Sequence, residues 1–219
     1  MVDILAVTAH PDDLEICAGG LFLKAKKEGK KTGLIICTRG ESGGYAEQAM
    51  REQEAKKAVE LLGLDYFRHL NFPDAAVFFS EDAVQTIIPL LRECSPKILL
   101  TLHQDDYHPD HVAVSRIVDA ATFVGGLNKY SSDGSDWKPK ELLYMCGDPR
   151  TNKRKPDIFI NIDDVWDEKL ACCNAHASQN VTEYAVKMAQ WYGMLGQCNY
   201  AEALYTRNPL TLSTADSLF

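Results

Sequence analysis

Strand-like and helix-like segments alternate along the first half of the chain, and this alternation constrains the fold more than any other feature of the sequence. Short apolar runs typical of strands lie at residues 3–9, 31–38, 65–72 and 97–103. Each is followed by a segment with helical hydrophobic spacing, at residues 14–28, 45–63, 80–94 and 110–126. Strand–helix units in succession predict a parallel sheet with helices on both faces.

The second half of the chain continues the pattern less regularly. A polar loop at 130–140 precedes strand-like segments at 141–147 and 156–162 and helical segments at 164–179 and 182–195. The chain has 219 residues, 46% of them apolar, and no repeat or linker divides it. We therefore expect a single Rossmann-like α/β domain over residues 1–219, with a mostly parallel sheet.

Charge and hydropathy narrow the class of partner. The formal net charge is −8 and no basic run opposes it, which argues against nucleic acid and anionic membranes and favours a small molecule. No apolar run reaches about 18 residues and the start has no leader pattern, so we expect a cytoplasmic protein without a membrane span.

The cysteines do not form a framework. The chain has seven, an odd number, with no Cys-x-x-Cys pair, so we expect reduced thiols that pack as small core residues. The adjacent Cys172 and Cys173 also fit a redox-sensing pair.

Polar clusters follow each of the first four predicted strands. They are His10 with Asp12 and Asp13, then "RGESGG" (39–44), "NFPDA" (71–75) and "HQDDYHPDH" (103–111). Open parallel sheets bind ligands at the carboxyl ends of their strands. We therefore expect these clusters to meet in one site.

His10 and Asp13 have the residue types and spacing of metal ligands. They lie three residues apart at a strand-to-helix turn, so both side chains can face one point. Zinc binds imidazole nitrogen and carboxylate oxygen, and a catalytic zinc keeps three protein ligands. The segment "HPDH" (108–111) can supply the third. Alone, the first motif would also fit a turn in which Asp12 or Asp13 caps the next helix.

Asp12 and Asp13 should point in different directions because they are neighbours in the sequence. One can hold the metal while the other faces water that the metal activates. Asp12 is then a candidate general base that takes a proton as the water attacks a carbonyl carbon.

The pair "AHPDDLE" (9–15) and "HPDH" (108–111) resembles the zinc-dependent deacetylases of the LmbE-like family, also called the PIG-L family. The similarity extends to "REQEAKKAVELLG" (51–63), "NFPD" (71–74) and "YAEALY" (200–205). The resemblance implies hydrolysis of the acetyl group from an N-acetylated amino sugar, releasing acetate and a free amine, with one Zn²⁺ per chain. The nearest branch is the bacillithiol-biosynthesis deacetylases, which act on N-acetylglucosaminyl malate. A homo-oligomer, of which a hexamer is one form, is a further implication.

The resemblance assigns roles to the motif residues. It makes His10, Asp13 and His111 the zinc ligands and Asp12 the base. His108 would stabilise the oxyanion or protonate the leaving amine, and Asp110 would hold the ring of His108.

Three further residues are candidate substrate contacts. Arg51 falls where the family has a substrate-binding arginine, although a solvated helix face explains it equally well. Glu41, in the glycine-rich turn, is a candidate contact to a sugar hydroxyl. Many relatives carry a tyrosine in a longer loop late in the chain, and Tyr184 is the nearby substitute for it here. A second difference lies in "NAHASQ" (174–179), where His176 stands at the position of a tyrosine in the bacillithiol-biosynthesis branch.

Two rival functions stay open. One is an amidase that acts on a larger sugar–thiol conjugate, which differs only in the shape of the pocket. The other is a nucleotide-binding or regulatory protein that uses the same sheet edge, although "AHPDDLEICAGG" (9–20) lacks a G-x-G-x-x-G pattern. His103, at the end of a predicted strand, is a weaker candidate for a contact to the site, and His69 is expected to be a packed or surface residue.

Overall fold

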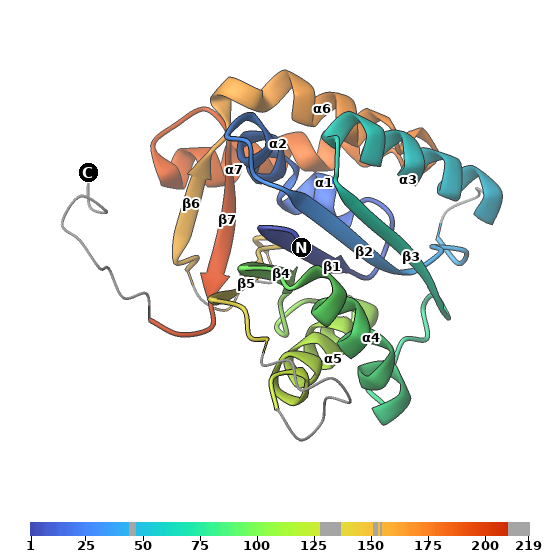
Figure 1. Cartoon of the computed structure of the whole chain (residues 1–219). Helices are drawn as coiled ribbons and strands as arrows, with labels where there is room; N and C mark the ends of the chain where they lie inside the picture. Colours follow the sequence, from blue (N-terminus) through green and yellow to red (C-terminus); the bar gives the residue numbers. More distant parts are fainter. Residues whose placement is uncertain (44–46, 128–136, 151–152, 154, 210–219) are drawn as a thin grey trace.

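The computed structural model describes residues 1–43, 47–127, 137–150, 153 and 155–209, and seven strands form a sheet in the order β3-β2-β1-β4-β5-β7-β6 (Figure 1). The strands are β1 (Ile4–Thr8), β2 (Thr32–Thr38), β3 (Tyr66–Phe72), β4 (Ile98–Leu102), β5 (Glu141–Met145), β6 (Ile158–Asn161) and β7 (Ala201–Thr206). The first five run parallel, and β7 pairs antiparallel with both β5 and β6. The α/β fold with a mostly parallel sheet is therefore confirmed.

Helices cover both faces of the sheet (Figure 1). One face carries α4 (Glu81–Cys94) and α5 (Pro109–Gly125). The other carries α1 (Asp13–Cys17), α2 (Gly19–Lys27), α3 (Gln48–Leu62), α6 (Trp166–Asn174) and α7 (Thr182–Gly196). The residues of β1 and β2 are buried throughout because they lie inside the sheet between these two layers.

The predicted helix at 14–28 is interrupted, and the reason is a buried carboxylate. Helix α1 ends at Cys17 and α2 begins at Gly19. Glu202 of β7 accepts hydrogen bonds from the backbone N–H groups of Gly20 and Leu21 at 2.6 and 2.7 Å, and so satisfies the free amides of the new helix N-terminus. Lys169 of α6 neutralises Glu202 at 2.6 Å.

Other boundaries also differ from the sequence-based prediction. Strand β7 was not expected, and the helix expected over 164–179 is a short 3₁₀ turn (Asp163–Val165), then α6, then a second 3₁₀ turn (Ala177–Gln179). Residues 45–46 of the helix predicted at 45–63 and residues 130–136 of the predicted loop lie outside the described residues.

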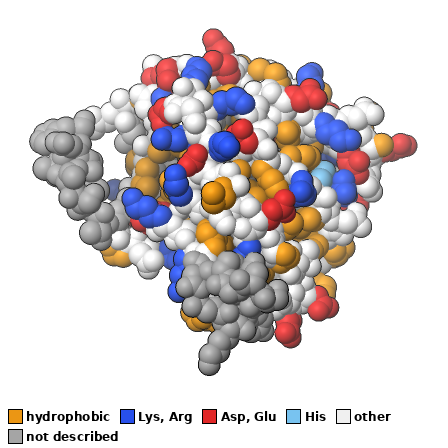
Figure 2. Space-filling model, in the orientation of Figure 1, with side chains coloured by type: hydrophobic (Ala, Val, Ile, Leu, Met, Phe, Trp, Pro, Cys, Tyr) orange, Lys and Arg blue, Asp and Glu red, His pale blue; other side chains and the backbone are white. Residues whose placement is uncertain are grey.

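Positive and negative side chains are mixed on the face of the molecule that Figure 2 shows. Lys and Arg lie among Asp, Glu and apolar side chains there. Among the described residues, no helix combines the length and apolarity needed to cross a membrane.

Candidate functional site

The polar clusters that follow β1, β2, β3 and β4 meet in one pocket, as the strand-end argument predicts. The pocket has a volume of about 360 Å³. Its walls include His10, Asp12 and Asp13 after β1, Ser42 and Gly43 after β2, Asp74 after β3, and Asp106, His108 and His111 after β4. The parallel strands bring these segments together because their carboxyl ends lie at the same edge of the sheet.

Donor atoms of three side chains lie near one another in the pocket wall. His10 Nδ1 lies 3.2 Å from His111 Nε2, and His111 Nε2 lies 3.2 Å from Asp13 Oδ1. The other oxygen of Asp13, Oδ2, accepts hydrogen bonds from the backbone N–H groups of Ala9 and His10. Asp13 is therefore held with one oxygen on the backbone and the other toward the histidines.

Carboxylates on the far side of each ring set which nitrogen faces the centre. His10 Nε2 lies 3.1 Å from Asp74 Oδ1 and 3.3 Å from Asp110 Oδ2, and His111 Nδ1 lies 2.9 Å from Asp106 Oδ2. A neutral ring in such a contact donates its proton to the carboxylate. The lone pairs of His10 Nδ1 and His111 Nε2, which lie 3.2 Å apart, are then both free for a cation.

The expected role of Asp110 needs correction. Its carboxylate contacts His10 and accepts from the backbone N–H groups of Ala75 (2.8 Å) and Val77 (3.1 Å). Only its backbone N–H reaches His108, donating to Nδ1 at 3.2 Å, because His108 is the N-cap of α5. Asp110 thus orients His10, and its side chain does not hold the ring of His108.

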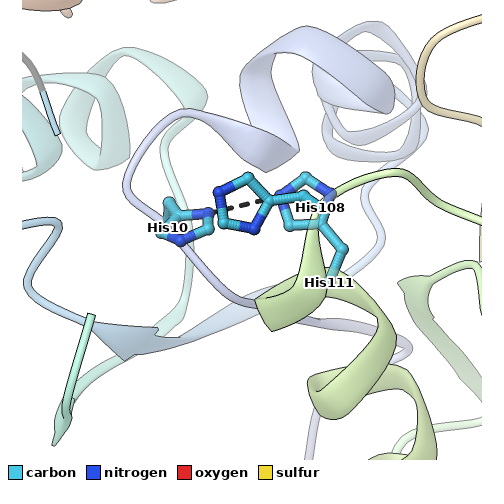
Figure 3. A group of neighbouring side chains, drawn as sticks. All are labelled: His10, His108 and His111. Carbon is cyan, nitrogen blue, oxygen red and sulfur yellow. Dashed lines mark hydrogen bonds between the residues drawn. The ribbon is translucent and has the colours of Figure 1, made fainter. Parts of the chain in front are cut away.

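Two separations between these donor atoms fit one zinc-sized cation. Two ligand atoms about 2.1 Å from a tetrahedral ion are about 3.4 Å apart, close to the two separations of 3.2 Å found here. His108 also lies near this point, since the ligand atoms of His10, His108 and His111 are within 4.8 Å of one another. Figure 3 shows the three rings grouped where α5 begins, and a dashed line joins His10 and His111.

The charges around His10 and His111 favour a cation. Burial by itself lowers the pKa of His10, but hydrogen bonds to Asp13 and Asp74 outweigh it and raise the pKa to about 11. Burial also lowers the pKa of His111, but the charge of Asp13 and a hydrogen bond to Asp106 outweigh it and raise the pKa to about 9. Both imidazoles therefore lie in a field that stabilises positive charge.

Asp12 lies in the pocket wall with properties suited to a base. Its side chain is 12% exposed, and burial together with the charge of Asp13 raises its pKa to about 6. Its φ of 151° lies in a region that residues other than glycine rarely adopt, so this backbone position is strained. The strained turn directs the side chains of Asp12 and Asp13 away from each other. The carboxylate of Asp12 contacts Arg51, and that of Asp13 contacts His111.

Arg51 is buried and supports Asp12, so the solvated helix face considered for it is wrong. Its side chain is 3% exposed. The guanidinium donates to the carbonyls of Gly40 (2.7 Å) and Pro11 (3.2 Å) and to Asp12 Oδ2 (3.3 Å). Gly40 has a φ of 66°, and a Cβ there would collide with the guanidinium, so this contact requires glycine.

The remaining predicted residues separate into those at the pocket and those elsewhere. Tyr184, in the first turn of α7, lines the pocket. Glu41 does not belong to its described lining; its carboxylate accepts from the backbone N–H of Asp74 at 2.9 Å. His103 lies against the ring of Tyr205, 4.3 Å away between centroids, and lines a different cavity. His176 is buried with its Nε2 3.6 Å from Glu15.

Two residues of the site were missed by the sequence reasoning. Asp74 and Asp106 hold the outer nitrogens of His10 and His111. Both lie in the polar clusters at 71–75 and 103–111, and the rule that a ligand histidine bonds a carboxylate through its second nitrogen could have singled them out.

Comparison with known proteins adds a family and relatives. A family model described as "PIG-L: GlcNAc-PI de-N-acetylase" matches residues 5–122. The diacetylchitobiose deacetylase of Thermococcus kodakarensis is 28% identical over 221 residues, which cover 92% of this chain and 81% of the relative. The probable N-acetyl-alpha-D-glucosaminyl L-malate deacetylase 2 of Bacillus cereus is 27% identical over 195 residues, which cover 80% of this chain and 83% of the relative.

Solved structures share the fold. The conserved protein TT1542 of Thermus thermophilus superposes with a TM-score of 0.89 at 31% identity, covering 97% of each chain. The 4-carboxy-2-hydroxymuconate hydratase GalB of Pseudomonas putida also gives a TM-score of 0.89, at 22% identity, covering 98% of this chain and 99% of that one. The second likeness concerns the fold alone, since this fold carries more than one chemistry.

Proposed function

The chain belongs to the PIG-L family, and from that membership we propose that it is a metal-dependent hydrolase that removes the acetyl group from an N-acetylglucosamine-type sugar conjugate. The observation that carries the proposal is the position of Asp12. It lies in the same pocket wall as the convergent donors of His10, Asp13 and His111, with a pKa raised to about 6. A protein that only bound a metal or a sugar would have no use for a carboxylate of this kind at that place.

His10, Asp13 and His111 would hold one Zn²⁺, which the separations of 3.2 Å from His111 Nε2 to His10 Nδ1 and to Asp13 Oδ1 support. When bound, the ion polarises the acetyl carbonyl and makes a nearby water more acidic. Asp74 and Asp110 would keep His10 in the tautomer that leaves Nδ1 free, and Asp106 would do the same for His111 Nε2.

Asp12 would act as the general base. With a pKa of about 6 it is mostly ionised at neutral pH, yet it is basic enough to take a proton from water that attacks the carbonyl carbon. Arg51 would hold Asp12 in place through the contact of 3.3 Å to Oδ2. The proton that Asp12 receives can then pass to the leaving nitrogen as the carbon–nitrogen bond breaks, which yields acetate and a free amine.

His108 would stabilise negative charge on the carbonyl oxygen. Its Nδ1 accepts from the backbone N–H of Asp110, so a neutral ring carries its proton on Nε2. Burial and the positive charges of His111 and His10 lower the pKa of His108, which favours the neutral form. A fixed N–H donor is what a developing oxyanion needs.

Acetate release tests this proposal. The panel is N-acetylglucosamine, N,N′-diacetylchitobiose, N-acetylglucosaminyl malate and a larger sugar–thiol conjugate, each with zinc-loaded and with chelated protein. We expect zinc-dependent acetate release from at least one N-acetylglucosamine compound and about one zinc per chain, lost in His10→Ala and in His111→Ala. Chelator-insensitive release would overturn the zinc assignment. Turnover of the sugar–thiol conjugate alone would identify an amidase.

A further inference from the structure

The segment "NAHASQ" (174–179) ends at the wall of the pocket but has no part in the steps proposed above. His176 anchors it in the interior, where the residue is 1% exposed. Ser178 anchors it on α3, because its backbone N–H and its hydroxyl donate to the two carboxylate oxygens of Glu54 at 2.8 and 2.6 Å. These contacts fix the backbone next to Gln179, which lines the pocket.

The carboxylate of Glu54 determines how the side-chain amide of Gln179 is oriented. A serine hydroxyl has one proton, and Ser178 donates it to Glu54. The Oγ atom can therefore only accept from its other partner, the side chain of Gln179 at 3.0 Å. An amide donates through its nitrogen, so Nε2 of Gln179 must face Ser178. The amide oxygen, Oε1, then points away from Ser178.

Oε1 of Gln179 lies beside the residue that contacts the proposed base. A Cβ on Gly43, which lines the pocket, would lie 3.5 Å from this oxygen and 2.8 Å from Nη1 of Arg51. The amide oxygen and the guanidinium are therefore on the same wall of the pocket, and Arg51 contacts Asp12 there. In the part of the chain that the structure describes, no group donates a hydrogen bond to Oε1.

We propose that Gln179 is a specificity-determining residue, whose Oε1 accepts a hydrogen bond from a hydroxyl group of the N-acetylated sugar ring. The inference rests on the proposed function and names a substrate contact in the same pocket. Because the bond to Ser178 already fixes the amide, the contact requires little further ordering of the side chain. A substrate without this hydroxyl would leave the oxygen unpaired in the complex, which lowers its affinity.

Acetate release tests the contact, with N-acetylglucosamine and a set of monodeoxy analogues, each of which lacks one hydroxyl. We expect Gln179→Ala to lower kcat/KM for N-acetylglucosamine about tenfold, mainly through KM. One analogue should show the same loss with the wild type, and Gln179→Ala should hydrolyse this analogue and N-acetylglucosamine equally well. The matched control is Gln48→Ala, which removes an exposed amide that donates to Glu52 at 2.8 Å on α3. It should behave like the wild type.

Variants of Ser178 test whether the amide is held in place before the sugar binds. Ser178→Ala removes the acceptor of Gln179 Nε2, so the amide can rotate and part of the preference for N-acetylglucosamine over this analogue should be lost. Ser178→Thr keeps a hydroxyl and should retain the preference. Lower turnover of both sugars in Ser178→Ala, with an unchanged ratio between them, would show that the hydroxyl does not position Gln179.

The outcomes separate this inference from the proposed function. If sugars release acetate and Gln179→Ala lowers kcat/KM no more than Gln48→Ala does, the inference is wrong and the function stands. If Gln179→Ala lowers kcat/KM but no analogue reproduces the loss, the donor is not a ring hydroxyl and the inference is overturned.

If no sugar releases acetate, the proposed function fails, and an NMR titration of the zinc-loaded protein with N-acetylglucosamine decides on the contact. Weaker binding to Gln179→Ala than to the wild type and to Gln48→Ala would support the contact alone. Equal binding to all three proteins, or no binding, would contradict both proposals.

Discussion

The carboxylate of Asp110 lies 3.3 Å from Nε2 of His10, so a residue at the start of α5 orients the histidine that follows β1. The same carboxylate accepts two backbone N–H bonds from the loop after β3. One buried side chain thus joins three of the strand-end segments that form the pocket. This relationship ties the geometry of the candidate metal centre to the packing of the sheet edge.

Asp110→Asn should therefore weaken metal binding without removing a metal ligand. An amide cannot accept as strongly from His10 Nε2, so the ring loses its fixed tautomer and the affinity for zinc should fall roughly 10- to 100-fold. Competition with a chromophoric chelator measures the affinity. Asp82→Asn, at an exposed position in the first turn of α4, is the control and should bind zinc like the wild type. Equal affinity in all three proteins would show that Asp110 does not tune His10.

The affinity for zinc should rise steeply with pH. The raised pKa values of His10, about 11, and His111, about 9, mean that this pair of rings holds an extra proton at neutral pH in the metal-free protein. Zinc must displace this proton, so binding should release it and the apparent Kd should fall as the pH rises toward 9. Calorimetry in buffers of different ionisation enthalpy counts the protons released. A Kd that does not change between about pH 6 and 9 would contradict the raised pKa values.

Removing Arg51 should move the acidic limb of the rate profile. Burial and Asp13 raise the pKa of Asp12, while the positive charge of Arg51 lowers it. Activity requires ionised Asp12 and is lost as the pH falls through its pKa, so Arg51→Met should shift this loss to higher pH. The measurement is log kcat/KM against pH for N-acetylated sugar hydrolysis. An unchanged limb together with a raised KM would instead assign Arg51 to substrate binding, as the family resemblance implies.

Much of the fold could be predicted from the sequence because local hydrophobic patterns report it. The buried runs of β1, β2 and β4 and the amphipathic pattern of α4 appear at nearly their observed bounds. Strand β7 was not predicted because it contains Glu202, a charged residue that breaks the apolar pattern. The burial of Glu202 depends on partners distant in the sequence, Lys169 and the N-terminus of α2. A hydrophobic pattern carries no information about such a partner.

In the candidate site, too, the local motifs could be predicted from the sequence, but one contact between residues distant in the sequence could not. The proposed ligands His10 and Asp13 and the histidines of "HPDH" lie in local motifs, and the rule on strand ends predicted that these motifs meet in one pocket. The contact of Asp110 was misassigned because the family resemblance implied that Asp110 holds the ring of His108, its near neighbour in the sequence. The helix N-cap instead points the backbone amide of Asp110 at His108 and frees its carboxylate for His10.

The buried ion pair of Lys169 and Glu202 should matter more for stability than a surface pair. Both side chains are almost inaccessible, at 1% and 2% exposure, so Lys169→Ala would leave an uncompensated carboxylate in the interior. We expect the free energy of unfolding to fall by about 3–5 kcal/mol. Lys24→Ala, which breaks the exposed pair with Asp164, should cost about 0–1 kcal/mol. Urea unfolding of both variants measures the difference, and equal losses would contradict this account.

Asp12 and Asp13 allow the sharpest test, because the same chemical change at adjacent residues should have different consequences. Asp13→Asn removes the charge of a proposed ligand, so zinc affinity should fall and added zinc should restore part of the rate. Asp12→Asn leaves the donor atoms of His10, Asp13 and His111 in place. Its zinc content should remain near one per chain while kcat drops by roughly 10²- to 10⁴-fold, with no rescue by zinc.

The pH dependence distinguishes the two variants further. The wild-type acidic limb should lie at or below about pH 6, since burial raises the pKa of Asp12 to that value and a bound cation favours its ionised form. Asp12→Asn should lose this limb, whereas Asp13→Asn saturated with zinc should retain one. Loss of zinc from Asp12→Asn together with full zinc in Asp13→Asn would reverse the two roles. Full zinc and full activity in both variants would leave the motif as a structural turn.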